Sequence, residues 1–170
     1  MDYKSLIRVI PDFPQKGISF KDITTLLKDG EAYKSSINQI ADFAKDKKID
    51  LVVGPEARGF VVGAPISYAL GVGFIPIRKK GKLPYDTIEV AYDLEYGKDF
   101  MAVHKDAILP GQRILITDDL LATGGTISST IELVRKLGGE IVGAAFLIEL
   151  SYLNGRDKIG DIEIFSLVTY

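Results

Sequence analysis

Cysteine and tryptophan are absent from this 170-residue chain, and histidine occurs once. Without cysteine the protein can have no disulfide framework, no zinc site built on thiolates and no cysteine nucleophile. Long apolar runs are absent too. No window holds the roughly eighteen consecutive apolar residues that a membrane-spanning helix needs, so we expect no association with a membrane.

An excess of charge of either sign is also missing. The 21 Lys and Arg residues nearly balance the 23 Asp and Glu residues, which leaves a net charge of -2. This balance argues against a nucleic-acid-binding domain, although local basic clusters could still bind phosphates. Residues 1–8 show neither the apolar run nor the cleavage pattern of a signal peptide, and we therefore expect a cytoplasmic protein.

Hydrophobic residues make up 46% of the chain, which is enough for a core in a domain of this length. Apolar runs bounded by Gly, Pro or Asp predict buried strands at residues 51–53, 74–77, 113–117, 141–150 and 162–168. Segments with helical spacing lie between them, at residues 31–48, 59–70 and 127–137. This alternation predicts an α/β fold in which helices flank a mostly parallel central sheet and ligands bind beyond the C-terminal ends of its strands.

Two stretches break the alternation. Residues 1–27 contain Pro11, Pro14 and Gly17, and we predict a helix followed by an irregular hood over the sheet edge. Residues 79–100 are polar with alternating apolar positions, which is typical of a long exposed hairpin or lid. Because no repeat, low-complexity tract or linker occurs, we predict one domain over residues 1–170 that includes the hood and the lid.

The most informative stretch is an apolar run that ends in Asp118 and Asp119 and continues through a glycine-rich turn into a helix. Backbone N–H groups in such a turn are unpaired and the helix dipole is positive there, so the turn is suited to an anion. The residues expected to bind a phosphate monoester are Ala122, Thr123, Gly124, Gly125 and Thr126. Adjacent carboxylates accept hydrogen bonds from neighbouring sugar hydroxyls, so phosphate and diol together indicate a ribose 5-phosphate.

An alternative interpretation takes Asp118 and Asp119 as a metal-binding or helix-capping pair and the glycines as a simple turn. It suits an isolated Asp-Asp or Gly-Gly, but it leaves the complete order of strand, acids, small residues and helix unexplained. Neither a Walker pattern nor a Gly-x-Gly-x-x-Gly after a strand occurs, so other modes of nucleotide binding lack their usual support.

Residues 114–126 resemble the phosphoribosyl pyrophosphate signature of the type I phosphoribosyltransferases, a family with a Rossmann-like fold. Four further stretches resemble the members of that family that use adenine: DFPQKGISFKDI at residues 12–23, EARGF at 56–60, IRKKGKLP at 77–84 and LEYGK at 94–98. The similarity covers nearly the whole chain. It implies an enzyme that converts adenine and 5-phospho-α-D-ribose 1-diphosphate (phosphoribosyl pyrophosphate, PRPP) into AMP and diphosphate.

The resemblance also implies where the donor binds. Asp118 and Asp119 would hold the ribose hydroxyls, and residues 122–126 would hold the 5-phosphate. The residues implied for pyrophosphate are Glu56, Ala57 and Arg58 in one loop and Arg78, Lys79 and Lys82 in a basic segment. A planar guanidinium such as that of Arg58 matches phosphate oxygens well. In the family, some contacts of the basic segment to pyrophosphate come from a neighbouring subunit. We expect Lys79 and Lys82, rather than Lys80, to contact the pyrophosphate. The alternative is that this run of charged residues is simply solvated.

The resemblance places base recognition in the hood. Main-chain groups there bind the base in the resembling enzymes, which corresponds to Ser19 and Lys21 here. Phe20 between them would either stack on the purine or anchor the hood. The resemblance gives proton transfer to Glu95 on the lid, during displacement through an oxocarbenium-like state. Tyr96 would help to seat the lid.

Magnesium is the implied cofactor, and it would arrive on the donor rather than in a protein site, because Mg²⁺ keeps waters and needs few protein ligands. The family usually forms homodimers, so we expect a second copy as a partner. No chemistry is assigned to His104.

Three other functions remain open. The acceptor could be xanthine, guanine, hypoxanthine or orotate, the protein could be a regulator that binds PRPP as a signal, or it could bind a nucleotide without catalysis. The hood and the EARGF and LEYG motifs favour adenine. Glu95, together with the lack of a spare N-terminal DNA-binding segment, argues against the regulator.

Overall fold

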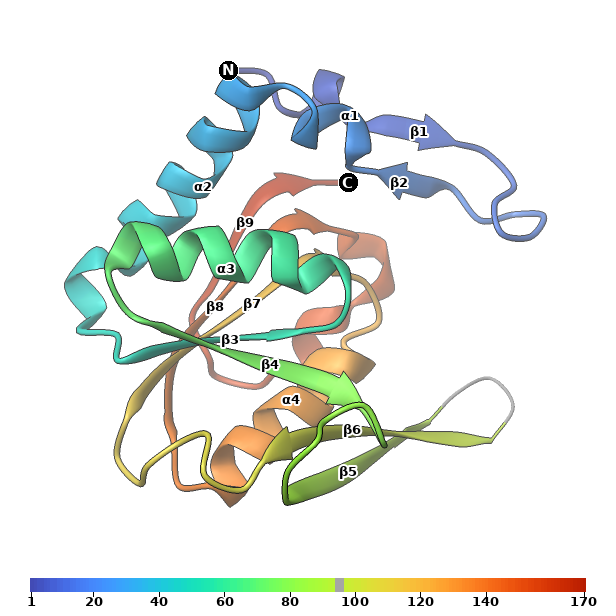
Figure 1. Cartoon of the computed structure of the whole chain (residues 1–170). Helices are drawn as coiled ribbons and strands as arrows, with labels where there is room; N and C mark the ends of the chain where they lie inside the picture. The colour runs from blue at the N-terminus through green and yellow to red at the C-terminus, as the bar shows by residue number, and fades with distance from the viewer. Residues whose placement is uncertain (94–96) are drawn as a thin grey trace.

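The computed structural model describes residues 1–93 and 97–170 (Figure 1). Within these residues the main sheet has seven strands in the order β5-β6-β4-β3-β7-β8-β9. The strands are β3 (Leu51–Pro55), β4 (Gly73–Lys79), β5 (Thr87–Asp93), β6 (Lys98–His104), β7 (Arg113–Leu121), β8 (Glu140–Glu149) and β9 (Ile164–Thr169). Strands β4, β3, β7, β8 and β9 run parallel, and β6 and β5 add an antiparallel edge. The predicted α/β fold with a mostly parallel sheet is therefore confirmed.

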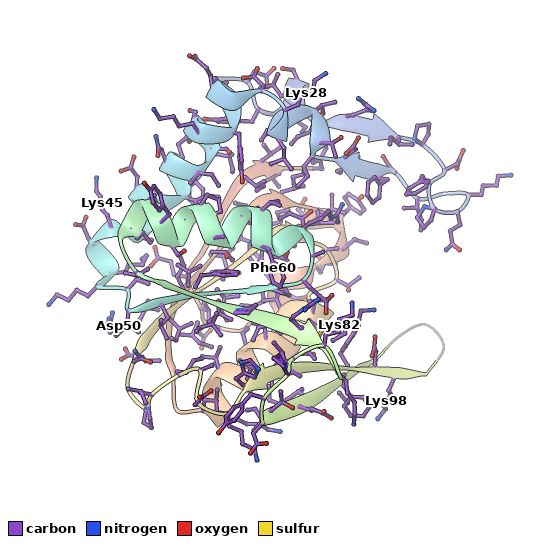
Figure 2. The ribbon with its side chains drawn as sticks, viewed as in Figure 1. Lys28, Lys45, Asp50, Phe60, Lys82 and Lys98 are labelled. Carbon is purple, nitrogen blue, oxygen red and sulfur yellow. The ribbon has the colours of Figure 1, made fainter. Side chains whose placement is uncertain are left out.

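Helices cover both faces of this sheet. Helices α2 (Gly30–Ala44) and α3 (Arg58–Leu70) lie on one face, and α4 (Gly125–Lys136) lies on the other (Figure 1). The alternation of side chains along each strand explains this division. Val52 and Leu115 pack with α2 and α3, whereas their neighbours Val53 and Ile116 pack with α4. Figure 2 shows the side chains that fill the space between the layers.

The helix ends follow their local sequence. Asp29 caps α2, because its carboxylate accepts the N–H groups of Glu31 and Ala32, each at 3.1 Å. Helix α3 ends at Leu70, and the residue that caps it, Gly71, has a φ of +69°, the left-handed conformation that favours glycine. Across residues 1–93 and 97–170, no helix combines the length and the apolar composition that crossing a membrane requires.

The hood is more regular than its sequence predicts. It consists of a short 3₁₀ helix, η1 (Lys4–Leu6), strands β1 (Arg8–Ile10) and β2 (Phe20–Asp22), and helix α1 (Thr24–Leu27). Strands β1 and β2 pair antiparallel, with Arg8 opposite Asp22. A short helix does come first, as predicted, but the prediction of irregular chain after it was wrong, because strands of three residues are too short to show an alternating pattern.

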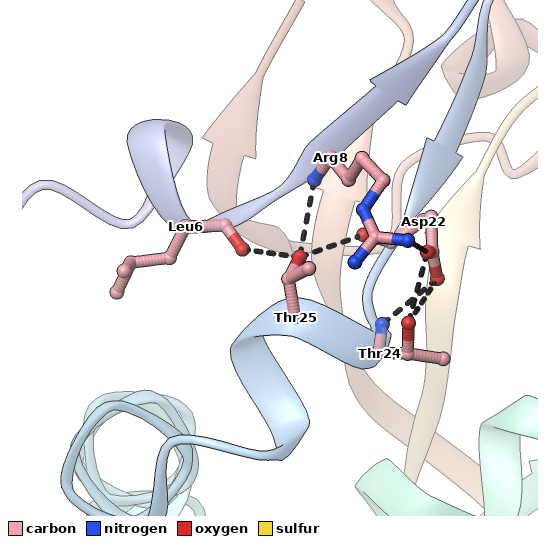
Figure 3. Close-up of polar contacts among 5 residues, drawn as sticks. All are labelled: Leu6, Arg8, Asp22, Thr24 and Thr25. Atoms are coloured by element: carbon pink, nitrogen blue, oxygen red, sulfur yellow. Dashed lines mark hydrogen bonds and ion pairs between the residues drawn. The ribbon is translucent and has the colours of Figure 1, made fainter.

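Polar contacts hold the hood together (Figure 3). Both carboxylate oxygens of Asp22 accept the Thr24 hydroxyl, and one also accepts the Thr24 N–H at 2.9 Å. The Thr25 hydroxyl donates to the Leu6 carbonyl at 2.7 Å and accepts the Arg8 N–H at 3.2 Å. Helix α1 is thereby tied to both strands of the hood.

The predicted hairpin is present in the described residues, although β5 begins only at Thr87 and β6 continues to His104. Strand β6 pairs with β4, so the hairpin extends the main sheet rather than standing apart from it. Val90 and Met101 of the hairpin belong to the same core cluster as Ile131 of α4. The hairpin is therefore fixed at its base by the core.

Candidate active site

Two strand-to-helix connections lie next to each other at the C-terminal ends of the parallel strands (Figure 1). Strand β3 leads into α3 through Glu56 and Ala57, and the adjacent β7 leads into α4 through residues 122–124. The N-termini of both helices present unpaired N–H groups and the positive ends of their dipoles. This edge, at the C-terminal ends of parallel strands, is where α/β sheets bind ligands.

Two buried carboxylates lie near the end of β7. Asp118 is 8% exposed and Asp119 is 4% exposed. The Asp119 N–H donates to Asp118 Oδ1 at 2.8 Å, and Asp119 Oδ2 lies 2.9 Å from Nε of Arg58. Gly59 permits this arrangement, since a Cβ at that position would lie only 2.8 Å from Asp118 Oδ1. The structure thus brings the predicted ribose carboxylates next to the arginine of the predicted pyrophosphate loop.

Burial raises the pKa of both carboxyl groups. For Asp118 the neighbouring charge of Asp119 raises the pKa further, well above its ordinary value. For Asp119 the guanidinium of Arg58 acts in the opposite direction and favours the ionised form. Two closely spaced, desolvated carboxyl groups of this kind gain from hydrogen-bond donors that arrive together, as the two hydroxyls of a ribose do.

A cavity of about 80 Å³ lies at the start of α4, lined by Asp118 and residues 120–127. Gly124 occupies the N-cap position with a φ of +82°, and α4 begins at Gly125. The N–H groups of the first helical turn have no partner inside the helix and are available to a bound anion. The lining includes every residue predicted to bind the 5-phosphate.

The Glu56 carboxylate contacts three residues of the basic segment. Its oxygens accept the Lys79 N–H at 2.5 Å and the Lys82 ammonium at 2.8 Å, and an Arg78 nitrogen lies at 3.8 Å. Lys82 is labelled beyond the end of β4 in Figure 2. Burial pushes the pKa of Glu56 upward, but the hydrogen bonds and charges of Lys82, Lys79 and Arg78 outweigh it and leave the pKa below its ordinary value. The peptide bond between Glu56 and Ala57 is cis.

The remaining cations of the segment pair with acids of the hairpin. The Lys79 ammonium lies 3.2 Å from Asp99, and the Lys80 ammonium lies 2.8 Å from Glu89 and over the ring of Phe100. The four predicted cations therefore do not form one cluster: Arg78 and Lys82 face Glu56, whereas the ammonium groups of Lys79 and Lys80 face the hairpin.

The hood reaches the same edge through Phe20. The guanidinium of Arg58 lies 5.2 Å from the centroid of the Phe20 ring, within the range of a cation–π contact. The Lys21 ammonium donates to the Ser19 hydroxyl at 2.8 Å and lies 4.4 Å from the centre of the Tyr170 ring. Burial, followed by the charge of Lys4, lowers the pKa of Lys21.

Glu95 and Tyr96, predicted for proton transfer and for seating the lid, lie outside the described residues. Sequence reasoning missed two neighbours of the site. Tyr170 carries the ring beneath Lys21, and the backbone of Gly155 touches the loop before α4. Both are distant in sequence from the residues they contact, and the only available signal for Gly155 was a turn-forming Asn-Gly pair.

Comparisons with known proteins agree on one kind of enzyme. Residues 21–169 match the family model described as "Phosphoribosyl transferase domain". The adenine phosphoribosyltransferase of Brevibacillus brevis is 69% identical over the full length of both chains. The crystal structure of the adenine phosphoribosyltransferase of Thermoanaerobacter pseudethanolicus is 54% identical, with a TM-score of 0.95 over 98% of this chain and 97% of the other. The Saccharomyces cerevisiae adenine phosphoribosyltransferase, solved with an imino-altritol bisphosphate and adenine, is 36% identical, with a TM-score of 0.93 over 96% of this chain and 95% of the other.

Proposed function

Because this chain belongs to the phosphoribosyl transferase family, we propose that the C-terminal ends of β3 and β7, together with the hood, form its active site. The chain is an enzyme that joins adenine to 5-phospho-α-D-ribose 1-diphosphate, releases diphosphate and forms AMP in purine salvage. The roles of individual residues proposed below follow from where their side chains lie.

The position of Arg58 is the observation that carries the assignment of the site. Its side chain pairs with Asp119, lies against Phe20 of the hood and follows directly after Glu56 and Ala57. Ribose, base and pyrophosphate are the three parts that the enzyme must bring together. Arg58 contacts Asp119, proposed for the ribose, and Phe20, proposed for the base, and it is itself proposed to bind the pyrophosphate. This supports one continuous site.

In the proposed complex the donor lies along the edge of the sheet. Its 5-phosphate occupies the cavity at residues 122–126, and its ribose hydroxyls donate to Asp118 and Asp119. The pyrophosphate faces Arg58, Arg78 and Lys82, and the Lys79 ammonium would reach it by leaving its pair with Asp99. Glu56 holds Lys82 beside this position rather than contacting the pyrophosphate, because two anions repel each other.

The reaction exchanges one bond at the anomeric carbon of the ribose for another. The bond to the pyrophosphate oxygen breaks, positive charge develops on the ribose in an oxocarbenium-like state, and the bond to the imidazole nitrogen of adenine forms. Asp118 and Asp119 would stabilise that positive charge, and the cations would stabilise the departing anion. We assign the proton that adenine loses to Glu95 as general base, a role worth a factor of about 10² to 10⁴. Tyr96 would help to close the hairpin over the site.

The base would lie under the hood, where the main chain of Ser19 and Lys21 provides hydrogen bonds and Phe20 provides a stacking surface. Phe20 is held in place by an edge-to-face contact with Phe13, whose ring centroid lies 5.2 Å away. Backbone recognition of this kind depends on the position of β2, and hence on the polar contacts of Asp22 and Thr25.

Magnesium would enter with the donor. Its chemistry when bound is to neutralise charge on the pyrophosphate and so favour its departure. Pyrophosphate and ribose oxygens and waters would hold the ion, because Mg²⁺ keeps waters and needs few protein ligands.

We also propose a homodimer and a cytoplasmic location. Tyr68 on α3 is 90% exposed and lies beside an apolar groove between α2 and α3 that includes Ile37 and Pro65. Covering this groove with a second copy would remove apolar surface from water. A cytoplasmic location would suit an enzyme whose donor and product are phosphorylated metabolites.

The test of the function is a panel of bases. Purified protein, Mg²⁺ and PRPP are incubated with adenine, hypoxanthine, guanine, xanthine or orotate, and nucleotide and diphosphate are measured. We expect AMP from adenine, and we expect Glu95→Gln to reduce the rate by about 10² to 10⁴. A preference for another base would overturn the specificity, and binding of PRPP without any product would overturn catalysis.

A further inference from the structure

The connection between β8 and β9 packs against the cavity proposed for the 5-phosphate. It contains two short 3₁₀ helices, η3 (Ser151–Leu153) and η4 (Gly155–Lys158), and η4 contacts α4. The closest approach is between two stretches of backbone. A Cβ on Gly155 would lie 2.3 Å from the Ala122 carbonyl oxygen, and a Cβ on Gly124 would lie 2.5 Å from the Gly155 carbonyl oxygen.

These distances leave no space for a side chain at either position, since real Cβ contacts essentially never fall below 3.0 Å. The two glycines differ in one respect. Gly124 has a positive φ, which itself favours glycine, whereas Gly155 is not among the residues with positive φ. At Gly155 the need for glycine therefore comes from the close packing alone. The atom it packs against, the Ala122 carbonyl oxygen, belongs to residues 122–126, which we call the 5-phosphate loop.

Hydrogen bonds of neighbouring residues hold Gly155 in this position. The next residue, Arg156, makes two hydrogen bonds of 2.6 Å to the two carboxylate oxygens of Glu149. Glu149 is 5% exposed and also accepts the Ser166 hydroxyl at 2.6 Å. Its pKa is lowered, first by the hydrogen bonds from Arg156 and against the opposing effect of burial. A second tie is the hydrogen bond of 2.9 Å from the Leu150 N–H to the Leu121 carbonyl.

We propose that Gly155, anchored by the Arg156–Glu149 pair, is a positioning residue that sets the shape of the 5-phosphate loop. The proposal rests on the function proposed above, because it takes residues 122–126 as the site of the 5-phosphate. Gly155 contacts the backbone of Ala122 and Gly124 but does not line the cavity itself, so it supports the loop without occupying the place proposed for the phosphate. Its backbone fixes Ala122 and Gly124, so that the N–H groups at the start of α4 are arranged before the anion arrives.

This role predicts which ligands depend on Gly155. PRPP and AMP carry the 5-phosphate, whereas adenine and diphosphate do not. Moving the Ala122 backbone by more than half an ångström, as a methyl group on Gly155 requires, would therefore weaken the two phosphorylated sugars selectively. Displacements approaching 1 Å at a binding group lower rates by up to about 100-fold.

The experiment measures KM for all four ligands in both directions of the reaction. For Gly155→Ala we expect KM for PRPP and for AMP to rise about 10- to 100-fold, with KM for adenine and for diphosphate within about twofold of wild type. Gly139→Ala is the matched control, because a Cβ there would also be crowded, at 2.7 Å from Val134, but Gly139 does not line the cavity proposed for the 5-phosphate. Equal losses for all four ligands, or an unchanged KM for PRPP, would overturn the proposal.

A second variant covers the case in which Gly155→Ala does not fold. Arg156→Gln removes the anchor without adding bulk, and the expected loss of stability is that of the broken pair, about 1–3 kcal/mol. We expect the same selective rise in KM for PRPP, and a smaller one in Arg156→Lys, which keeps the charge but loses the planar fork. Folded Arg156→Gln protein with wild-type KM for PRPP would refute the role of the anchor.

Calorimetry with ribose 5-phosphate separates failure of this proposal from failure of the proposed function. If wild type made no AMP, the function would be wrong, yet binding of ribose 5-phosphate could still be compared between wild type and Gly155→Ala. If wild type were active and both proteins bound ribose 5-phosphate equally, only the positioning role would be wrong.

Discussion

Replacing Gly59 with alanine tests the packing around the ribose carboxylates. Gly59 lies in the first turn of α3, where an added Cβ would be 2.8 Å from Asp118 Oδ1 and 3.1 Å from Cδ of Pro55. The proline ring cannot rotate away, so the carboxylate must move. That movement would stretch the hydrogen bond of 2.8 Å that Asp118 accepts from the Asp119 N–H, and it would misplace the oxygen that receives a ribose hydroxyl.

The size of the effect follows from these contacts. Losing one hydrogen bond to a charged group costs about 1.5–3 kcal/mol, which corresponds to about a 10- to 100-fold fall in kcat/KM for PRPP. The overpacking itself should lower the free energy of unfolding by about 1–3 kcal/mol. The fall in kcat/KM should exceed any loss caused by instability alone, because the clash acts directly on a proposed substrate contact.

Gly139→Ala is the matched control. A Cβ on Gly139 would lie 2.7 Å from Val134 and 3.1 Å from Ile114, at the opposite end of β7 from the site. Both variants are assayed by initial rates with varied PRPP and by urea denaturation. We expect similar losses of stability but a large kinetic loss only in Gly59→Ala. Equal kinetic losses in the two variants, or none in Gly59→Ala, would show that packing against Asp118 does not control the use of PRPP.

Other variants test electrostatics and the core. Arg58→Gln removes the charge that favours ionised Asp119, so the pKa of Asp119 should rise and the acid limb of the pH profile of kcat/KM for PRPP should move to higher pH; an unmoved limb would contradict the pairing. Glu149 has its pKa lowered from an ordinary value of 4.5, so its pair with Arg156 stabilises the fold above that value and is lost as pH falls through the lower folded-state pKa. Glu149→Gln should therefore unfold about 1–3 kcal/mol more easily at neutral pH and lose less stability than wild type on acidification, as urea titrations at several pH values would show. Phe146→Ala, at a fully buried position, should lower the free energy of unfolding by about 3–5 kcal/mol, and a loss below 1 kcal/mol would mean that the core is not packed as described.

The sequence was most informative where structure and chemistry are local. The run from Arg113 to Thr126 contains a strand, its terminal acids, an anion-binding turn and a helix start in one continuous stretch. Apolar runs and helical spacing also predicted the sheet, because the central strands β3, β7 and β8 are buried along most of their length and the helices pack one side against them. Such features depend on neighbours along the chain.

Contacts between distant residues could not be predicted in the same way. Nothing near Glu56 indicates that its carboxylate will hold Lys82, 26 residues later. The sequence around Gly155 indicates only an ordinary turn, and its contact with Ala122 is evident only in the structure. The pairing of β1 with β2 was missed because a long loop separates strands of three residues each. In all three cases the information lies in tertiary packing rather than in a local pattern.

The most direct test of the site is a crystal structure of the protein with AMP. We expect the phosphate in the cavity at residues 122–126, the ribose hydroxyls on Asp118 and Asp119, and the adenine ring against Phe20 beneath the hood. A larger groove of about 710 Å³, lined by residues that include Arg135 and Lys158, lies elsewhere on the surface. AMP bound in that groove, with the cavity at the start of α4 empty, would contradict the account.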